Sequence, residues 1–425
     1  MNQIRQARSP GQAMRWSLGG LLLLPPGLHF LGFGSSYALG LSLFAAMVLV
    51  LEFLLLKPTV SKTAVAVLLI TTIILPLHLL IVSVANPTVS ILWDRALLSL
   101  IVINLIILVT DTVARNALLM SADAFDRTIT QLAVLLLILG FLSFVTSGIA
   151  FHILGLPSSI PPFSEPSHFT LALTPFAIYG LASRNRRIIL LSLTFIPFMI
   201  LEVYSSVFLI LIVIITLIRV PIWLVPIAIL GLIYLTDVIL LLTQSILAGY
   251  GLEYYLDRLT FGYSENLSVL VYQQGIDLVK SAFTAEYLLG FGFQQLGTSD
   301  LGFDSTSRIQ EILGGSIINT RDGSFLVAKL FGEFGILAVT MVAPLGFMIV
   351  VAFRNIQKHY TGRNRLAPQI LFAYCCIYGF IIELIFRGIG YFSLGGTLLF
   401  CALFTLSRFK RAKRAQSYDS VNQDQ

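Results

Sequence analysis

Residues 319–323 read NTRDG, and residues 324–353 follow as SFLVAKLFGEFGILAVTMVAPLGFMIVVAF. The longest polar segment of the chain ends at this junction, and the apolar run after it exceeds the roughly 20 residues of a membrane-spanning helix. The junction predicts that Arg321 lies on one face of a bilayer, at the start of a span that is long, tilted or protruding.

The composition places the whole chain in the same class as this stretch. Apolar residues make up 57% of the sequence and charged residues 11%, with a mean hydropathy of +0.90. A soluble domain carries roughly 25% charged residues, so we expect an all-α polytopic membrane protein. Apolar runs of helical length recur from Trp16 to Leu406, which differs from the short alternating strands of a membrane barrel.

Basic residues between the apolar runs set the expected topology. They predict about 12 transmembrane helices, an uncleaved first span and both termini in the cytoplasm. We expect helices 1–9 with short loops in residues 1–242, one large periplasmic loop in 243–322, helices 10–12 in 323–407 and a basic cytoplasmic tail in 408–425. Because the net charge of +6 comes from such anchors, it indicates no nucleic-acid partner.

Two segments, 188–218 and 264–280, give more specific predictions of helices. The apolar run 188–218 lies between two basic sites, so it predicts two short or tilted spans that meet near Glu202, with a re-entrant segment left open. Within the large loop, residues 264–280 carry apolar side chains at helical spacing and predict an amphipathic helix. Tyrosines elsewhere in this loop predict that it folds onto the bundle.

Arg321 and the glycines after it are the first candidate site. Arg321 is either an interfacial anchor with Asp322 as a cap, or a binder of an anionic group, because a guanidinium suits phosphate oxygens in bidentate fashion. Gly332 and Gly335 are either ordinary packing positions or places where a lipid chain or helix approaches closely.

The spacing Arg321-x10-Gly332 resembles the arginine motif in an outer loop of Wzy-type O-antigen polymerases. Arg321-Asp322-x9-Gly332-x-x-Gly335 also resembles the His-Asn-x9-Gly-x-x-Gly motif of the related O-antigen ligases, with Arg in place of His, which favours a polymerase. Ser164-Glu165-Pro166-Ser167-His168 is similar to a Glu-Pro-Ser element of polysaccharide polymerases. Some polymerases carry a second Arg-x10-Gly in an earlier outer loop, and the expected earlier outer loops of this chain have none, which argues against a two-arginine relay of that kind.

Other charged residues of the expected outer side have two interpretations each. Glu165 caps a helix or accepts a proton from a sugar hydroxyl, and His168 begins that helix or carries a proton. Arg258 and Arg308 are surface residues or help to stabilise a leaving diphosphate, and Glu202 lies at a helix break. Glu383 and Arg387, four residues apart, are expected to pair with each other.

The resemblance implies a helical fold similar to that of GT-C-type glycosyltransferases. It implies a polymerase in the bacterial inner membrane that joins oligosaccharide units carried on undecaprenyl pyrophosphate at the periplasmic face. Catalytic roles then fall to Arg321, Glu165 and Glu202, and substrate binding to Arg258, Arg308, His168, Asp322, Gly332 and Gly335. Membrane lipids, a chain-length regulator and a flippase are the expected partners.

Several features are missing from the sequence. It has no phosphate-binding Walker loop, and its outer loops have no Asp-x-Asp or His-rich ligand set, so we expect neither a metal nor another cofactor. Cys375, Cys376 and Cys401 lie inside apolar runs and indicate neither disulfides nor a metal site. The rival interpretations are a ligase that transfers glycan to lipid A core and a flippase or transporter with twelve spans.

Overall fold

The computed structural model describes residues 10–33, 37–55, 59–86, 90–154, 160–201, 206–228, 230–231, 266–284, 287–298, 302–316, 318 and 320–423. Throughout these residues the regular structure is helical, apart from one isolated bridge between Ile160 and Phe163. The expectation of an all-α chain is confirmed for this part of the protein.

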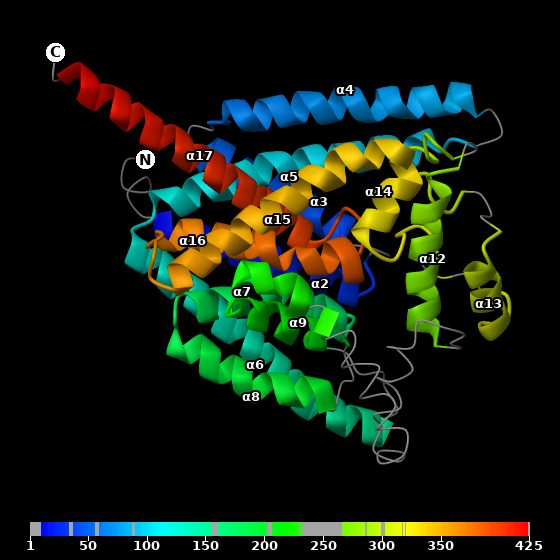
Figure 1. Ribbon diagram of the computed structural model, residues 1–425, viewed down its shortest axis with the longest axis horizontal. Coiled ribbons are helices and arrows are strands. Elements are labelled where there is room, and N and C mark those ends of the chain that lie inside the picture. The colour runs from blue at the N-terminus through cyan, green and yellow to red at the C-terminus, as the bar shows by residue number, and fades with distance from the viewer. Residues whose placement is uncertain are drawn as a thin grey trace.

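The helices of the first half run antiparallel to one another in sequence order (Figure 1). Their bounds are α2 Pro10–Phe30, α3 Ala38–Leu55, α4 Lys62–Ala85, α5 Trp93–Leu119, α6 Ala122–Leu154, α7 Pro166–Ala182, α8 Arg186–Leu201 and α9 Ser206–Leu217. A short 3-10 turn, η1 Ile222–Leu224, follows. Helices α7 and α16 lie in the middle of the bundle, and nearly all of α7 is buried.

In the second half, the first two named helices lie at the side of the bundle, α12 Leu267–Ser281 and α13 Asp304–Ile312 (Figure 1). The chain then returns through α14 Leu326–Phe334, the 3-10 turn η2 Gly335–Ala338 and α15 Val339–Tyr360. It ends with α16 Pro368–Gly379, the π-helical turn η3 Ile382–Phe386 and the long α17 Leu394–Gln423. No break in α17 marks the expected boundary between residues 407 and 408.

Helix length and surface chemistry define an all-helical membrane protein. Five helical segments of the described chain are long and apolar enough to cross a bilayer: 62–85, 93–119, 122–142, 326–360 and 368–386. Helix α4 leaves Leu69, Ile73, Leu77 and Leu80 about half exposed. An apolar face of this extent is costly in water but suits a hydrocarbon environment. The total of twelve spans stays a prediction.

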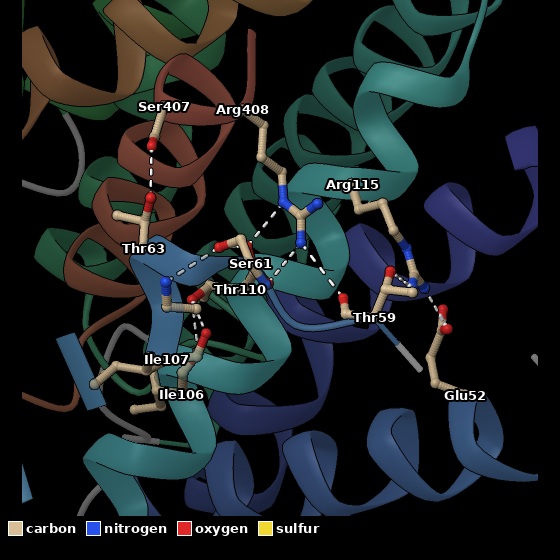
Figure 2. Close-up of polar contacts among 12 residues, drawn as sticks. Glu52, Thr59, Ser61, Thr63, Ile106, Ile107, Thr110, Arg115, Ser407 and Arg408 are labelled. Carbon is tan, nitrogen blue, oxygen red and sulfur yellow. Dashed lines mark hydrogen bonds and ion pairs between the residues drawn. The ribbon is translucent and has the colours of Figure 1, made fainter. Parts of the chain in front are cut away.

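One end of the bundle, here called the basic end, carries the loops with most of the arginines and lysines. It holds the junctions α5–α6, α7–α8 and α15–α16 and the C-terminal half of α17 (Figure 1). Arg408 donates from two nitrogens to Asp111, at 2.8 and 2.6 Å, and Ser61 donates to the same carboxylate (Figure 2). This buried bidentate pair fastens α17 to α5 and to the start of α4.

A second ion pair reinforces the basic end. Arg115 of α5 lies 2.5 Å from the Glu52 carboxylate of α3 (Figure 2). Asn116 donates to the other Glu52 oxygen. Arg115 also donates to Thr59. Because removal of one partner of a buried pair leaves an uncompensated charge, these contacts hold α3, α4, α5 and α17 in a fixed arrangement.

The opposite end is here called the loop end. Four described segments form it: 160–165, 287–298, 320–325 and 387–393. Helix α12 packs against α14 and α13 packs against α12, so this part of the large loop lies on the bundle as expected. The predicted amphipathic helix over 264–280 is confirmed as α12, with Val269, Leu270, Val271, Gln274 and Leu278 on its buried face.

Two of the expected membrane-crossing runs are each divided between two α-helices. The run 188–218 does form two helices, α8 and α9, and the segment between them, with Glu202, lies outside the described residues. The run 324–353, expected as a single long span, is interrupted at η2 after Gly335. At the end of the region 1–242, where helices 1–9 are expected, residues 229 and 232–242 also lie outside the described residues.

Candidate functional site

The segment 287–298 closes the end of α14. The last carbonyls of a helix lack intrahelical partners. Here the amide of Phe291 donates to the Gly332 carbonyl at 2.9 Å, and that of Gly292 donates to the Glu333 carbonyl at 2.8 Å. Such close backbone contact requires small residues in α14. A side chain at Gly332 would press on Leu296 and Leu278.

Gly335 ends α14 in a conformation that disfavours other residues. Its φ of +55° lies in the left-handed region, and a Cβ there would collide with the Leu288 carbonyl oxygen. The Ile336 amide donates to that same oxygen at 2.9 Å. Both glycines of the motif are therefore buried under the chain's own loop, and contact with a substrate at these positions stays a prediction.

The same segment is also anchored to the C-terminal part of α4 and to the start of α5. Gln295 accepts from the Leu92 amide at 2.8 Å, and Arg95 donates to the Leu296 carbonyl at 3.0 Å. His78 of α4 hydrogen-bonds the Leu289 carbonyl at 3.1 Å. The large loop is thus held against α4, α5 and α14 near the position of Arg321.

Arg321 lies in a turn that folds back over the first turn of α14. Arg321 and Asp322 are exposed, whereas Gly323 and Ser324 are buried. Gly323 has a φ of +67°, and a Cβ there would lie 2.9 Å from the backbone of Lys329. Within the described part of the chain Arg321 forms no ion pair, and its stem covers Gly297. Its guanidinium is therefore available to an anion from outside.

Directly behind this turn lies a buried charge pair in α14. The Lys329 ammonium is 3.1 Å from a Glu333 oxygen and donates to the Arg321 carbonyl at 2.5 Å. Tyr391 donates to the other Glu333 oxygen at 2.8 Å, and its ring lies under the ammonium. Sequence reasoning did not select Lys329 or Tyr391. A lysine four residues from a glutamate inside an apolar run is the signal that identifies such a pair.

Arg321 with the Lys329–Glu333 pair behind it is the first polar group of the loop end. Glu165 and Arg387 form the second. Their side chains are 2.8 Å apart and partly exposed. Glu165 is the N-cap residue of α7, yet its side chain makes no capping hydrogen bond and instead accepts from Arg387 and Ser167. The surrounding protein partly desolvates the carboxylate, which favours protonation, but Arg387, His168 and Ser167 together outweigh this and hold the pKa of Glu165 below its usual range.

His168 connects this group to α3. Its Nε2 lies 3.8 Å from Glu165, and its Nδ1 is 3.1 Å from the Tyr37 hydroxyl. His168 is buried, and its Nε2 has no hydrogen-bond partner among the described residues. If Tyr37 donates to Nδ1, the Nε2 of the neutral ring carries the proton and faces Glu165. Tyr37 is a further residue that the sequence did not single out.

The expected pairing of Glu383 with Arg387 is wrong. Glu383 is buried and accepts hydrogen bonds from Ser393 and from the Gly395 amide at the start of α17. Arg387 follows the last residue of the π-helical turn η3 and has an extended backbone (φ −150°, ψ 103°), so the four-residue spacing of a helix does not apply to it. Arg387 is thereby directed to Glu165.

The segment 387–391 joins the two polar groups. Arg387 contacts Glu165, the Gly388 amide donates to the Ser324 carbonyl at 2.9 Å, and Tyr391 reaches Glu333. A Cβ at Gly390 would lie 3.3 Å from the Asp322 carboxylate. The structure therefore brings the Glu165 and Arg321 regions, far apart in sequence, against one connecting segment.

Three predicted site residues remain: Arg308, Arg258 and Glu202. Arg308 lies on α13, half-buried and engaged in contacts of its own, away from the Glu165 group. Arg258 and Glu202 lie outside the described residues. No protein-family model, curated protein or solved structure matches this chain.

Proposed function

We propose that the protein is a glycan polymerase that uses a lipid-diphosphate-linked donor at the loop end. The observation that carries this proposal is Arg321, an exposed arginine without an ion-pair partner in the described chain, next to a buried network that supports its turn. An unpaired guanidinium at the end of a membrane bundle suits a diphosphate that a lipid carrier holds at the same depth.

The charge of the two ends supports a periplasmic site. Loops rich in Lys and Arg face the cytoplasm in membrane proteins, and the basic end carries such loops, including Arg184, Arg186, Arg187, Arg363 and Arg365. This orientation gives a bacterial inner-membrane protein with both termini in the cytoplasm. A donor carried on undecaprenyl pyrophosphate needs no nucleotide supply on the periplasmic side.

The proposed reaction is a single transfer. A hydroxyl of the terminal sugar of a new lipid-linked unit attacks the anomeric carbon of the growing chain. The bond from that carbon to the diphosphate oxygen breaks, and Arg321 stabilises the negative charge on the departing diphosphate. Glu165 takes the hydroxyl proton and later releases it to water. Arg387 and Ser167 donate to Oε2 of Glu165, so the proton goes to Oε1. The next round begins when the lipid diphosphate leaves.

The test uses purified protein in liposomes with lipid-linked repeat units and no ion gradient. Wild-type protein is expected to produce a ladder of glycan lengths on a gel. Arg321→Ala should reduce the rate about a hundredfold, the scale of losing one preorganised transition-state donor. Arg321→Lys, which keeps the charge but loses the planar fork, should fall between the two. Arg363→Ala, at an exposed arginine of the basic end, is the matched control and should polymerise normally.

Other outcomes separate the rival functions. A deletion strain of a polymerase should retain single-repeat glycans and lose the ladder. Accumulation of long lipid-linked polymer in that strain would indicate a ligase acting on lipid A core. Movement of lipid-linked units that requires a gradient, with no change in glycan length, would indicate a flippase or transporter. Normal polymer with Arg321→Ala would return Arg321 to an interfacial anchor.

A further inference from the structure

The buried pair in α14 is costly enough to require a reason. Lys329 is 1% exposed and Glu333 is 0% exposed, so both charges are removed from solvent. Desolvation of two charges commonly offsets their mutual attraction, and an apolar pair of similar volume is often at least as stable. Stability alone therefore does not account for a lysine and a glutamate at these positions.

The contacts of Lys329 show where its charge is used. Besides Glu333, its ammonium has one hydrogen-bond partner in the described chain, the backbone carbonyl of Arg321. That carbonyl belongs to the residue whose side chain is exposed at the loop end. The ammonium of buried Lys329 thus hydrogen-bonds the backbone of exposed Arg321.

The turn is enclosed on its other sides as well. Gly323 lies directly on the backbone of Lys329, and Gly390 lies between the Asp322 carboxylate and the Lys329 stem. Tyr391, one residue further, fixes Glu333 by its hydroxyl and covers the ammonium with its ring. Each of these contacts limits the movement of the backbone that carries Arg321 and Asp322.

We infer that Lys329, together with Glu333 and Tyr391, is a positioning network that sets the place of Arg321 for its anionic substrate. Lys329 touches no substrate in this arrangement and acts through the Arg321 carbonyl. The inference rests on the proposed function, since it assigns the network a role in binding the diphosphate of the donor. It predicts that the turn loosens when the lysine is neutralised, even if the helix around it remains folded.

The decisive variant removes both charges at once. Lys329→Met with Glu333→Gln leaves no uncompensated charge and keeps an amide oxygen for the Tyr391 hydroxyl, but it removes the hydrogen bond to the Arg321 carbonyl. The single variant Lys329→Met leaves Glu333 buried without its counter-ion and is expected to fold poorly. The matched control is Asp111→Asn with Arg408→Met, which neutralises the buried pair of the basic end (Figure 2).

Hydrogen exchange and polymer synthesis are then measured on the purified full-length proteins. In the double variant of α14, the thermal midpoint should stay within a few degrees of wild type, while amide exchange over residues 320–326 rises at least tenfold. Polymer synthesis should fall at least tenfold, mainly through a higher KM for the lipid-linked donor. The basic-end control should leave exchange over 320–326 and the KM for the donor unchanged.

The two hypotheses fail in different ways. Unchanged exchange over 320–326 in the α14 double variant overturns the positioning network, whatever its activity. Faster exchange with normal polymer synthesis also overturns it, because a loosened turn would then still allow Arg321 to act normally. A wild-type protein that makes no polymer overturns the proposed function itself, and that failure is visible before any variant is compared.

Discussion

At the scale of single residues, the ion pair between Glu165 and Arg387 joins positions 222 residues apart. Both side chains are partly exposed, so the pair contributes only about 0.5 kcal/mol to stability. Its effect on chemistry is larger in the proposed reaction, since Arg387 lowers the pKa of Glu165 and donates to one of its oxygens, Oε2, as Ser167 does. The other oxygen, Oε1, has no hydrogen bond among the described residues, and we expect the acceptor sugar to meet Glu165 there.

Glu165→Gln separates these two effects. Because the pair contributes little stability, the thermal midpoint of the purified variant should change by at most about 2 °C. Loss of a general base lowers rates by about a hundredfold or more, so the ladder of polymer lengths should disappear. Glu311→Gln, at an exposed glutamate of α13, is the control and should retain the ladder. Normal polymerisation by Glu165→Gln would leave Glu165 with a structural role only.

The sequence contains part of this site and lacks the rest for a physical reason. Arg321 at a polar-to-apolar junction and Glu165 before Pro166 are local signals, and both residues are exposed at the loop end. The partner of Arg387 is not a local property. Helical spacing favoured Glu383, but the helical turn ends at Phe386 and the extended backbone of Arg387 directs its side chain to Glu165.

At the scale of elements, the break between α14 and α15 decides how the site is built. The apolar run 324–353 has the length of one tilted span, and its composition contains no proline at the break. The interruption comes from Gly335, whose positive φ lets the chain turn while segment 287–298 donates to the free carbonyls of α14. Because those partners are distant in sequence, hydropathy predicted the span but not its division.

Gly335→Ala tests this element directly. Alanine at a φ of +55° costs about 2 kcal/mol in backbone strain, and its methyl group would also collide with the Leu288 carbonyl. We expect a lower thermal midpoint and loss of exchange protection in 287–298. Gly346→Ala is the matched control in the middle of α15, where no atom obstructs a methyl group, and it should be neutral or stabilising by about 0.5–1 kcal/mol. Equal midpoints for the two variants would contradict the assigned role of Gly335.

At the scale of the whole molecule, the two ends of the bundle have different chemistry. The basic end is closed by the bidentate Arg408–Asp111 pair and the Arg115–Glu52 pair, whereas the loop end exposes Arg321, Asp322 and part of the Glu165–Arg387 pair. The exposed apolar sides between the ends allow lipid chains to approach the bundle laterally. Composition and charge distribution predicted this polarity. The mutual approach of segments 160–165, 320–325 and 387–391 depends on packing among distant helices and could not be predicted from them.

The orientation of this polarity decides whether a lipid-linked donor can reach the site, and cysteine labelling measures it. Ser307→Cys places a thiol on exposed α13, and Arg411→Cys places one on the exposed C-terminal part of α17. The native Cys375, Cys376 and Cys401 are buried and should react slowly. In intact spheroplasts, a membrane-impermeant maleimide should label position 307 and spare position 411, which should react only after permeabilisation. The reverse pattern would place Arg321 in the cytoplasm and remove the physical basis for a periplasmic polymerase.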